Sequence, residues 1–157
     1  MTISTTVTAL QTIAVGVTGV TSAPTRYPGS LNSVDLPQVI TWPAEGETKG
    51  AQFQISIRTY RMAVYIKPSE QGLTGEGWAS ANTVLQALIE ALMDTDNRIL
   101  VSSGGYTSQI IAGNDRPLMD GGITVLGYPV QATGTEGYPH YFGFELMVPV
   151  KETWSES

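Results

Sequence analysis

Few residues in this sequence of 157 amino acids have side chains that suit catalysis. Cysteine is absent and histidine occurs once, which excludes a thiol nucleophile, a disulfide framework, cysteine-ligated zinc and a histidine-rich metal site. His140 stands between Pro139 and Tyr141 in an expected turn, and no serine elbow or partner acid occurs in an obvious relation to it. We interpret His140 as a surface histidine and not as a catalytic base.

Two pairs of aspartates, Asp94 with Asp96 and Asp115 with Asp120, carry the oxygen ligands that calcium prefers. Neither pair lies in a loop with the spacing of an EF-hand, so both are expected to be solvated acids in turns.

The glycine pairs at 104–105 and 121–122 lack both the lysine of a phosphate-binding loop and the spacing of a dinucleotide-binding loop, which favours turns. Arg58 and Arg61 lie on one expected strand, where two arginines more often pair with acids than bind nucleic acid. The sequence therefore assigns no catalytic, cofactor-binding or metal-binding residue, and we expect no enzyme.

The charge is low and acidic, with 8 Lys and Arg against 14 Asp and Glu and a net charge of -6. This balance argues against a surface that binds phosphates, although an acidic channel could let DNA slide through by repelling its backbone. Because only 14% of residues are charged, the exterior must rely on uncharged polar side chains, which favours contact with other protein. An ordinary soluble monomer remains the alternative.

Hydrophobic periodicity predicts where a membrane span, the helices and the strands could lie. No stretch reaches the roughly 20 apolar residues that a membrane span needs, and residues 1–20 lack the basic start of a signal peptide. The longest alternating stretch is Gln52 to Pro68, which predicts one strand with a register change near Thr59, as in a β-bulge, or else two shorter strands. Its two apolar sets are Phe53, Ile55 and Ile57, and Tyr60, Met62, Val64 and Ile66.

Two segments have the spacing of amphipathic helices. Residues 6–15 form the first, with a cap from Ser4, Thr5 or Thr6; many β-branched residues leave a strand as the alternative. Residues 78–93 form the second and end at about Met93, with an apolar stripe of Trp78, Ala81, Leu85, Leu88 and Leu92.

Proline, glycine and small polar residues predict long loops at about 21–37 and 68–76. A short strand at 38–42 should end at Pro43, followed by a turn at 44–50 and, beyond the second helix, a loop at 113–122. Further strands are expected at 99–101, 106–111, 122–132 and 141–150, with a tail at 151–157 that frays or is held only by Trp154. This order predicts a single α+β domain over residues 1–157, with a mostly antiparallel sheet and two helices packed on it.

In this layout the chain resembles the tail terminator, or tail completion, proteins of long, flexible-tailed bacteriophages. The resemblance extends over nearly the whole chain and rests on the segments IAVGVTGV, YPGSLNSVDLPQVITWP, RTYRMAVYIKPSEQG, ANTVLQALIEAL and YFGFELMVPV. It implies a structural virion protein, made in the host cytoplasm, that forms a ring, typically a hexamer, at the head-proximal end of the tail tube. Such a ring ends tube polymerisation and joins the tail to the head connector, while DNA passes through its lumen without specific binding.

A ring needs surfaces for its neighbours, the tube protein and the connector protein, and long loops with apolar side chains are suited to that role. The candidate assembly contacts are Tyr27, Leu31, Trp42, Glu70, Gln71 and Leu73. Trp42 could instead pack in the core of the subunit. Other functions stay open: another neck or head-tail joining ring, a monomeric carbohydrate-binding module with an aromatic cleft, or a small hydrolase with two facing carboxylates.

Overall fold

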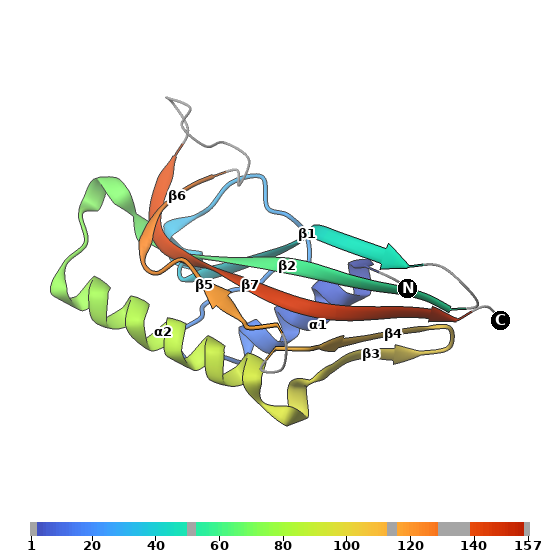
Figure 1. Cartoon of the computed structure of the whole chain (residues 1–157). Helices are drawn as coiled ribbons and strands as arrows, with labels where there is room; N and C mark the ends of the chain where they lie inside the picture. Colours follow the sequence, from blue (N-terminus) through green and yellow to red (C-terminus); the bar gives the residue numbers. More distant parts are fainter. Residues whose placement is uncertain (1–2, 50–52, 113–115, 129–138, 156–157) are drawn as a thin grey trace.

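A 16-residue strand near the C-terminus, β7 (His140–Ser155), forms the centre of the sheet in this computed structural model (Figure 1). The structure describes residues 3–49, 53–112, 116–128 and 139–155. On one side, β7 pairs antiparallel with β2 (Phe53–Pro68) along nearly its whole length. On the other side it pairs with β4 (Tyr106–Ile110), β5 (Met119–Asp120) and β6 (Thr124–Gly127). Two edge strands, β1 (Gln38–Lys49) and β3 (Ile99–Ser103), complete a sheet of order β1-β2-β7-β4-β3.

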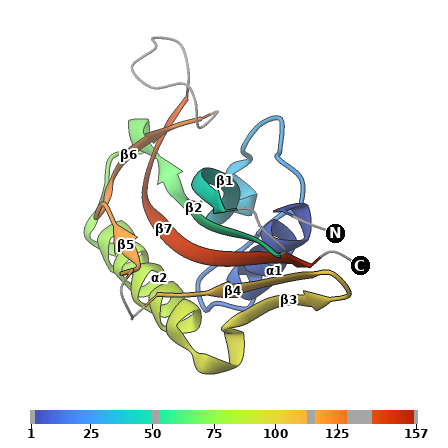
Figure 2. The ribbon, with the colours of Figure 1, turned by 45° about the vertical axis from the view of Figure 1, so that its right-hand side comes forward.

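Both helices, α1 (Ile3–Val15) and α2 (Gly75–Met93), cover the same face of this twisted sheet (Figure 2). Side chains alternate between the faces of a strand, so the even-numbered positions of β2 and β7 point to the helices together. The fully buried residues of this main core include Tyr60, Met62, Val64, Phe144, Leu146 and Val148. The fold is therefore α+β with an antiparallel sheet, as the sequence predicts.

A smaller apolar cluster lies on the opposite face of the sheet. Its buried members are Ile40, Ala63, Tyr65, Tyr128 and Tyr141. No helix covers it among the described residues; instead the loop at 21–37 packs there through Leu31 and Leu36. The loop predicted from its prolines is thus present, with one 3-10 turn at Ser33–Asp35, and it acts as the cover of the second face.

The helix boundaries differ from the prediction at their N-terminal ends. Helix α1 begins at Ile3, and Thr6 is not a cap but a fully buried residue within the helix. Helix α2 begins at Gly75, after the capping side chain of Thr74, so the 68–76 loop is shorter and contains a 3-10 turn at Ser69–Gln71. Trp78 was expected on the buried stripe but is 48% exposed. The stripe itself is confirmed by buried Leu88 and Leu92, and the helix ends at Met93 as predicted.

The predicted register change in β2 is wrong. The ladder between β2 and β7 runs without a shift from Phe53 to Tyr65, so Ile55 and Ile57 face away from the helices, where Ile55 is 36% exposed. Near Thr59 the irregularity lies in the neighbouring strand, where β1 has an extra residue between Pro43 and Gly46, and the extra residue of β2 itself is Ile66, between Tyr65 and Lys67. Pro43 does not end β1, because an edge strand can hold a proline whose missing N–H faces outward. The predicted turn at 44–49 is therefore strand.

Several further strand boundaries also change. The tail was expected to fray, but β7 continues through Ser155 and is paired on both sides there by β2 and β4. Strand β3 extends to Ser103, β4 ends at Ile110, and the two-residue β5 lies in a predicted loop. The strand predicted at 122–132 is observed as β6, and its part beyond 128 lies outside the described residues. None of the described helices is both long and apolar enough to cross a membrane.

Candidate functional site

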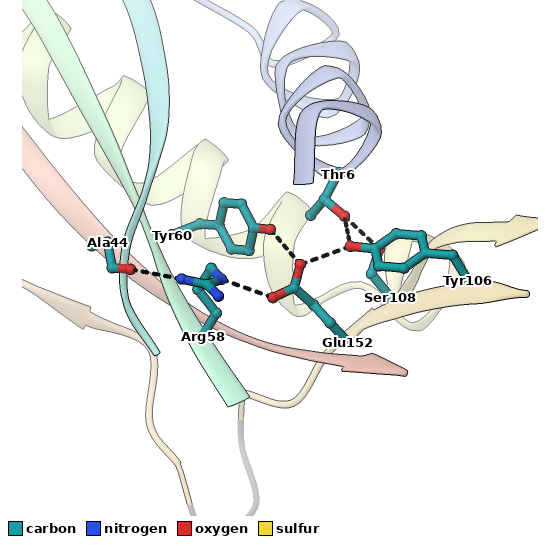
Figure 3. Close-up of polar contacts among 7 residues, drawn as sticks. All are labelled: Thr6, Ala44, Arg58, Tyr60, Tyr106, Ser108 and Glu152. Atoms are coloured by element: carbon teal, nitrogen blue, oxygen red, sulfur yellow. Dashed lines mark hydrogen bonds and ion pairs between the residues drawn. The ribbon is translucent and has the colours of Figure 1, made fainter. Parts of the chain in front are cut away.

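The most polar cluster inside the protein surrounds Glu152, whose side chain is fully buried (Figure 3). Arg58 Nε donates to Glu152 Oε1 at 2.9 Å, and the hydroxyl groups of Tyr60 and Tyr106 each donate to Oε2 at 2.7 Å. These donors come from β2 and β4, the strands on the two sides of β7. Glu152 therefore ties three adjacent strands together through both of its oxygens.

A second layer of polar groups surrounds this carboxylate. Thr6 Oγ1, from α1, lies 2.6 Å from the Tyr106 hydroxyl and donates to Ser108 Oγ at 2.9 Å. Arg58 also donates to the carbonyl oxygen of Ala44 in the bulged part of β1, at 3.2 Å. The network thus extends from β1 to the first turns of α1, where the helix dipole favours a negative charge nearby.

The electrostatics of the cluster agree with a structural role. Burial, reinforced by the hydrogen bond to the Glu152 carboxylate, raises the pKa of Tyr60 far above its usual value. Burial also raises the pKa of Tyr106. Both phenols therefore stay neutral and keep donating. Because Glu152 has no exposed surface and several hydrogen bonds, we interpret the cluster as a clamp of the fold and not as a catalytic site.

The expectation that the strand arginines pair with acids is confirmed. Beside the Arg58–Glu152 pair, Arg61 donates to Glu145 on β7 at 2.6 Å. This second pair lies on the other face of the sheet, in a hollow of about 300 Å³ that Trp42, Tyr65 and Val125 also line.

Four tyrosines form a row across this second face, which was not predicted from the sequence. Tyr27 stacks on Tyr128 with ring centroids 5.6 Å apart, and Tyr65 meets the edges of Tyr128 and Tyr141 at 5.7 and 5.6 Å. The Tyr128 hydroxyl donates to the carbonyl of Pro28, and burial raises the pKa of Tyr128 to about 12. This tyrosine row ties the 21–37 loop to the sheet.

The candidate contacts of the first loop gather beside this row. Tyr27 is 47% exposed, whereas Leu31 and Trp42 are half-buried against the cluster of Tyr65 and Tyr128. Trp42 therefore packs in the subunit, and it also lines the hollow on the surface.

The other three candidates lie in the connection between β2 and α2. Glu70 is exposed and Gln71 ends the 3-10 turn, while Leu73 lies over Gly77 in the first turns of α2. Burial raises the pKa of Tyr141, the last tyrosine of the row, and the negative charge of Glu70 raises it further. The six candidates thus form two groups, one near each end of the tyrosine row.

The helix side of the molecule has a groove between α1 and the C-terminal part of α2. Its volume is about 490 Å³, and its lining includes Thr12, Ile13, Gly16, Ala87, Glu90 and Asp94. A smaller hollow of about 230 Å³ shares Thr12 and Ile13 and continues it toward Ile99. We call the two together the α1–α2 groove.

The described aspartates of the two pairs lie in or beside turns. The side chain of Asp94 accepts a hydrogen bond from the backbone of Asp96, and that of Asp120 accepts one from Gly122, as acids in turns do. Asp115 lies outside the described residues. Among the residues that the structure describes, no group of three or more acids or histidines could hold a metal ion.

Comparison of the sequence with family models and with curated proteins finds no match to either.

Proposed function

We propose that this protein is a ring-forming subunit of a bacteriophage virion that closes the head-proximal end of a tail tube and joins it to the head connector. The resemblance in layout suggests this role, and the surface of the subunit supports it. A neighbouring neck or head-tail joining ring is the nearest alternative, since it would need the same kind of surface.

The observation that carries the proposal is a pair of unlike apolar surfaces on opposite sides of the sheet. On the helix side, Val15, Met93 and Ile99 are 52%, 47% and 52% exposed. On the loop side, Tyr27 and Val34 are 47% and 80% exposed. A ring is built by head-to-tail contacts, which require two different complementary patches on each copy. Exposed apolar groups of this size are typical of surfaces that bind protein.

The charge of the subunit suits a channel for DNA. With a net charge of -6, a ring of several copies carries a strong negative field, which keeps a passing phosphate backbone from binding. The proposal therefore includes DNA as a molecule that passes through the lumen and not as a ligand.

The first test is the mass of the purified protein in solution, by light scattering after size exclusion, with negative-stain images of the same fractions. A closed oligomer with a central hole would support the ring. A monomer over a wide range of concentration, both alone and with assembled tail tubes, would contradict it. Binding to the ends of tubes, with a stop to their growth, separates a terminator from another neck ring.

One observation favours a second function, a monomeric carbohydrate-binding module. The hollow on the loop side combines Trp42 with the Arg61–Glu145 ion pair, and an aromatic ring beside charged hydrogen-bonding groups is suited to bind a sugar. Titration with a panel of oligosaccharides, followed by tryptophan fluorescence, tests this function. A sugar-dependent change in wild type that Trp42→Ala abolishes, in a protein that stays monomeric, would favour the module over the ring.

A further inference from the structure

The α1–α2 groove is large enough to hold a segment of another chain, and its lining combines apolar with polar and acidic side chains. Its lining includes the small residues Gly16 and Ala87 and the larger Ile13 and exposed Ile99, and exposed Met93 lines a neighbouring hollow. Glycine and alanine let a guest backbone approach the helices closely. The groove is open, and the described residues place no side chain of the same subunit across it.

The charged side chains that line the groove are all acidic. Glu90, Asp94 and Asp96 are exposed and belong to its lining, and no Lys or Arg does. Both α1 and α2 end at the groove, and the C-terminal end of a helix carries partial negative charge. A guest with apolar side chains and a positive charge therefore fits it best.

The 21–37 loop has these properties. It presents Val34, the most exposed large hydrophobic side chain that the structure describes, together with Tyr27. Arg26 is exposed there and makes no ion pair with any residue that the structure describes. The loop carries one acid of its own, Asp35, which is half-buried near its base.

The loop is held in shape before any partner arrives. Gln11, fully buried in α1, donates through Nε2 to the carbonyls of Pro24 and Val39, both at 2.7 Å, and accepts from Thr41 at 2.6 Å. Thr21 and Ser22 bond to the far end of the loop at Leu36 and Asp35. A preorganised loop loses less conformational entropy on binding than a flexible one.

In one copy the outer part of the loop and the groove face different sides of the sheet, because Leu31 packs in the cluster on the loop side, whereas Ile13 and Ala87 of the groove pack against the main core. We propose that the loop at residues 25–34 of one copy docks into the α1–α2 groove of the next, with Arg26 facing the carboxylates of Glu90 and Asp94. This inference rests on the proposed function and names the contact that would close the ring.

The absence of cysteine allows a direct test by disulfide trapping. Thr12→Cys places a thiol in the groove and Val34→Cys places one on the loop; both residues are exposed. The two single variants, mixed under mild oxidation, should form a mixed dimer much faster than either forms a dimer with itself. The double variant should form a covalent ladder that stops at the size of the ring. Ser80→Cys, exposed on the N-terminal half of α2, replaces Thr12→Cys in the control pair and should not react preferentially.

Charge reversal gives an independent readout by light scattering. Arg26→Glu and Glu90→Arg should each raise the concentration of half-association at least about tenfold, and the double variant should recover most of the loss. Arg116→Glu changes the net charge equally, at an exposed site outside the loop, and should have little effect.

The two proposals fail differently. Rings whose Thr12→Cys and Val34→Cys variants cross-link no faster than the control pair would overturn the loop-in-groove contact and leave the ring standing. Single charge reversals that change association no more than Arg116→Glu would also overturn the contact. A protein that neither associates nor forms the mixed disulfide would overturn both.

Discussion

Arg58 and Glu152 form an ion pair in which the arginine is partly exposed to solvent and the glutamate is fully buried. Nε and Oε1 are 2.9 Å apart, the Arg58 side chain is 20% exposed, and the Glu152 side chain is fully buried. The guanidinium can therefore reach water while the carboxylate depends on its protein partners. Such a pair specifies the alignment of β2 and β7 more than it adds stability, since burial of the charge costs about as much as the attraction gains.

Removing the charge of Glu152 should destabilise the protein strongly. In Glu152→Gln an amide NH2 replaces one oxygen, so a donor faces the donors of Arg58 or of Tyr60 and Tyr106. We expect a loss of about 3–5 kcal/mol in the free energy of unfolding, measured by urea titration. Glu145→Gln is the matched control, because the Arg61–Glu145 pair is partly exposed and should contribute less than about 1 kcal/mol. Equal losses in the two variants would show that Glu152 is not a clamp.

The protein should lose stability steeply above pH 10. The tyrosines with a raised pKa in the fold are Tyr60, Tyr65, Tyr106, Tyr128 and Tyr141. In the unfolded chain they ionise near pH 10, while the folded state holds them neutral, so their contribution is complete below that pH and falls above it. Urea midpoints at increasing pH should drop from about pH 10, and Tyr60→Phe should make this slope shallower. A midpoint that stays constant to pH 11 would contradict the burial of these phenols.

Gly143 has no room for a side chain. A Cβ at this position of β7 would overlap the carbonyl oxygen of Val64 and press on Leu126. Gly143→Ala should therefore force the β2–β7 ladder apart and cost about 3 kcal/mol or more, seen as a lower thermal midpoint. Gly121→Ala is the control, since a Cβ there meets nothing within 4 Å. A neutral Gly143→Ala would mean that the two strands are farther apart than described.

Leu88→Asp should prevent folding, because it places a charge where the side chain is fully buried between α2 and the sheet. Trp78→Asp, ten residues earlier on the same helix, removes a larger apolar group from a site that is 48% exposed and should leave the subunit folded. Circular dichroism and the elution volume distinguish the two outcomes. A folded Leu88→Asp variant would show that the buried face of α2 is assigned wrongly.

The periodicity of apolar residues correctly predicted those parts of the helix and strand faces that are apolar without interruption. The alternation of Tyr60, Met62 and Val64 and the stripe of Leu88 and Leu92 each define a face without reference to a partner, and both are confirmed. The register change near Thr59 was inferred because Ile55 and Ile57 were assumed to be buried with the others. A strand pairs by its backbone, and the helix face of β2 is filled there by Ser56 and Arg58, which Glu152 accommodates.

The polar residues of the interior were the least predictable part. Thr6 was expected as a possible helix cap and Glu152 belonged to the tail expected to fray, yet both are buried, as is Gln11. Their partners lie far away in the sequence, and a hydrogen bond between residues 102 positions apart, as in Thr6 with Ser108, leaves no local signal. The tyrosine row was missed for the same reason.

The position of β7 in the chain also decides when the fold can form. Every strand that pairs with β7 precedes it, so β1 and β2 on one side and β3 to β6 on the other are synthesised before the strand that joins them. Until residues 140–155 leave the ribosome, the two halves of the sheet have no common neighbour. The main core can therefore close only after synthesis of β7, and a nascent chain has no complete subunit to offer a neighbour before that moment.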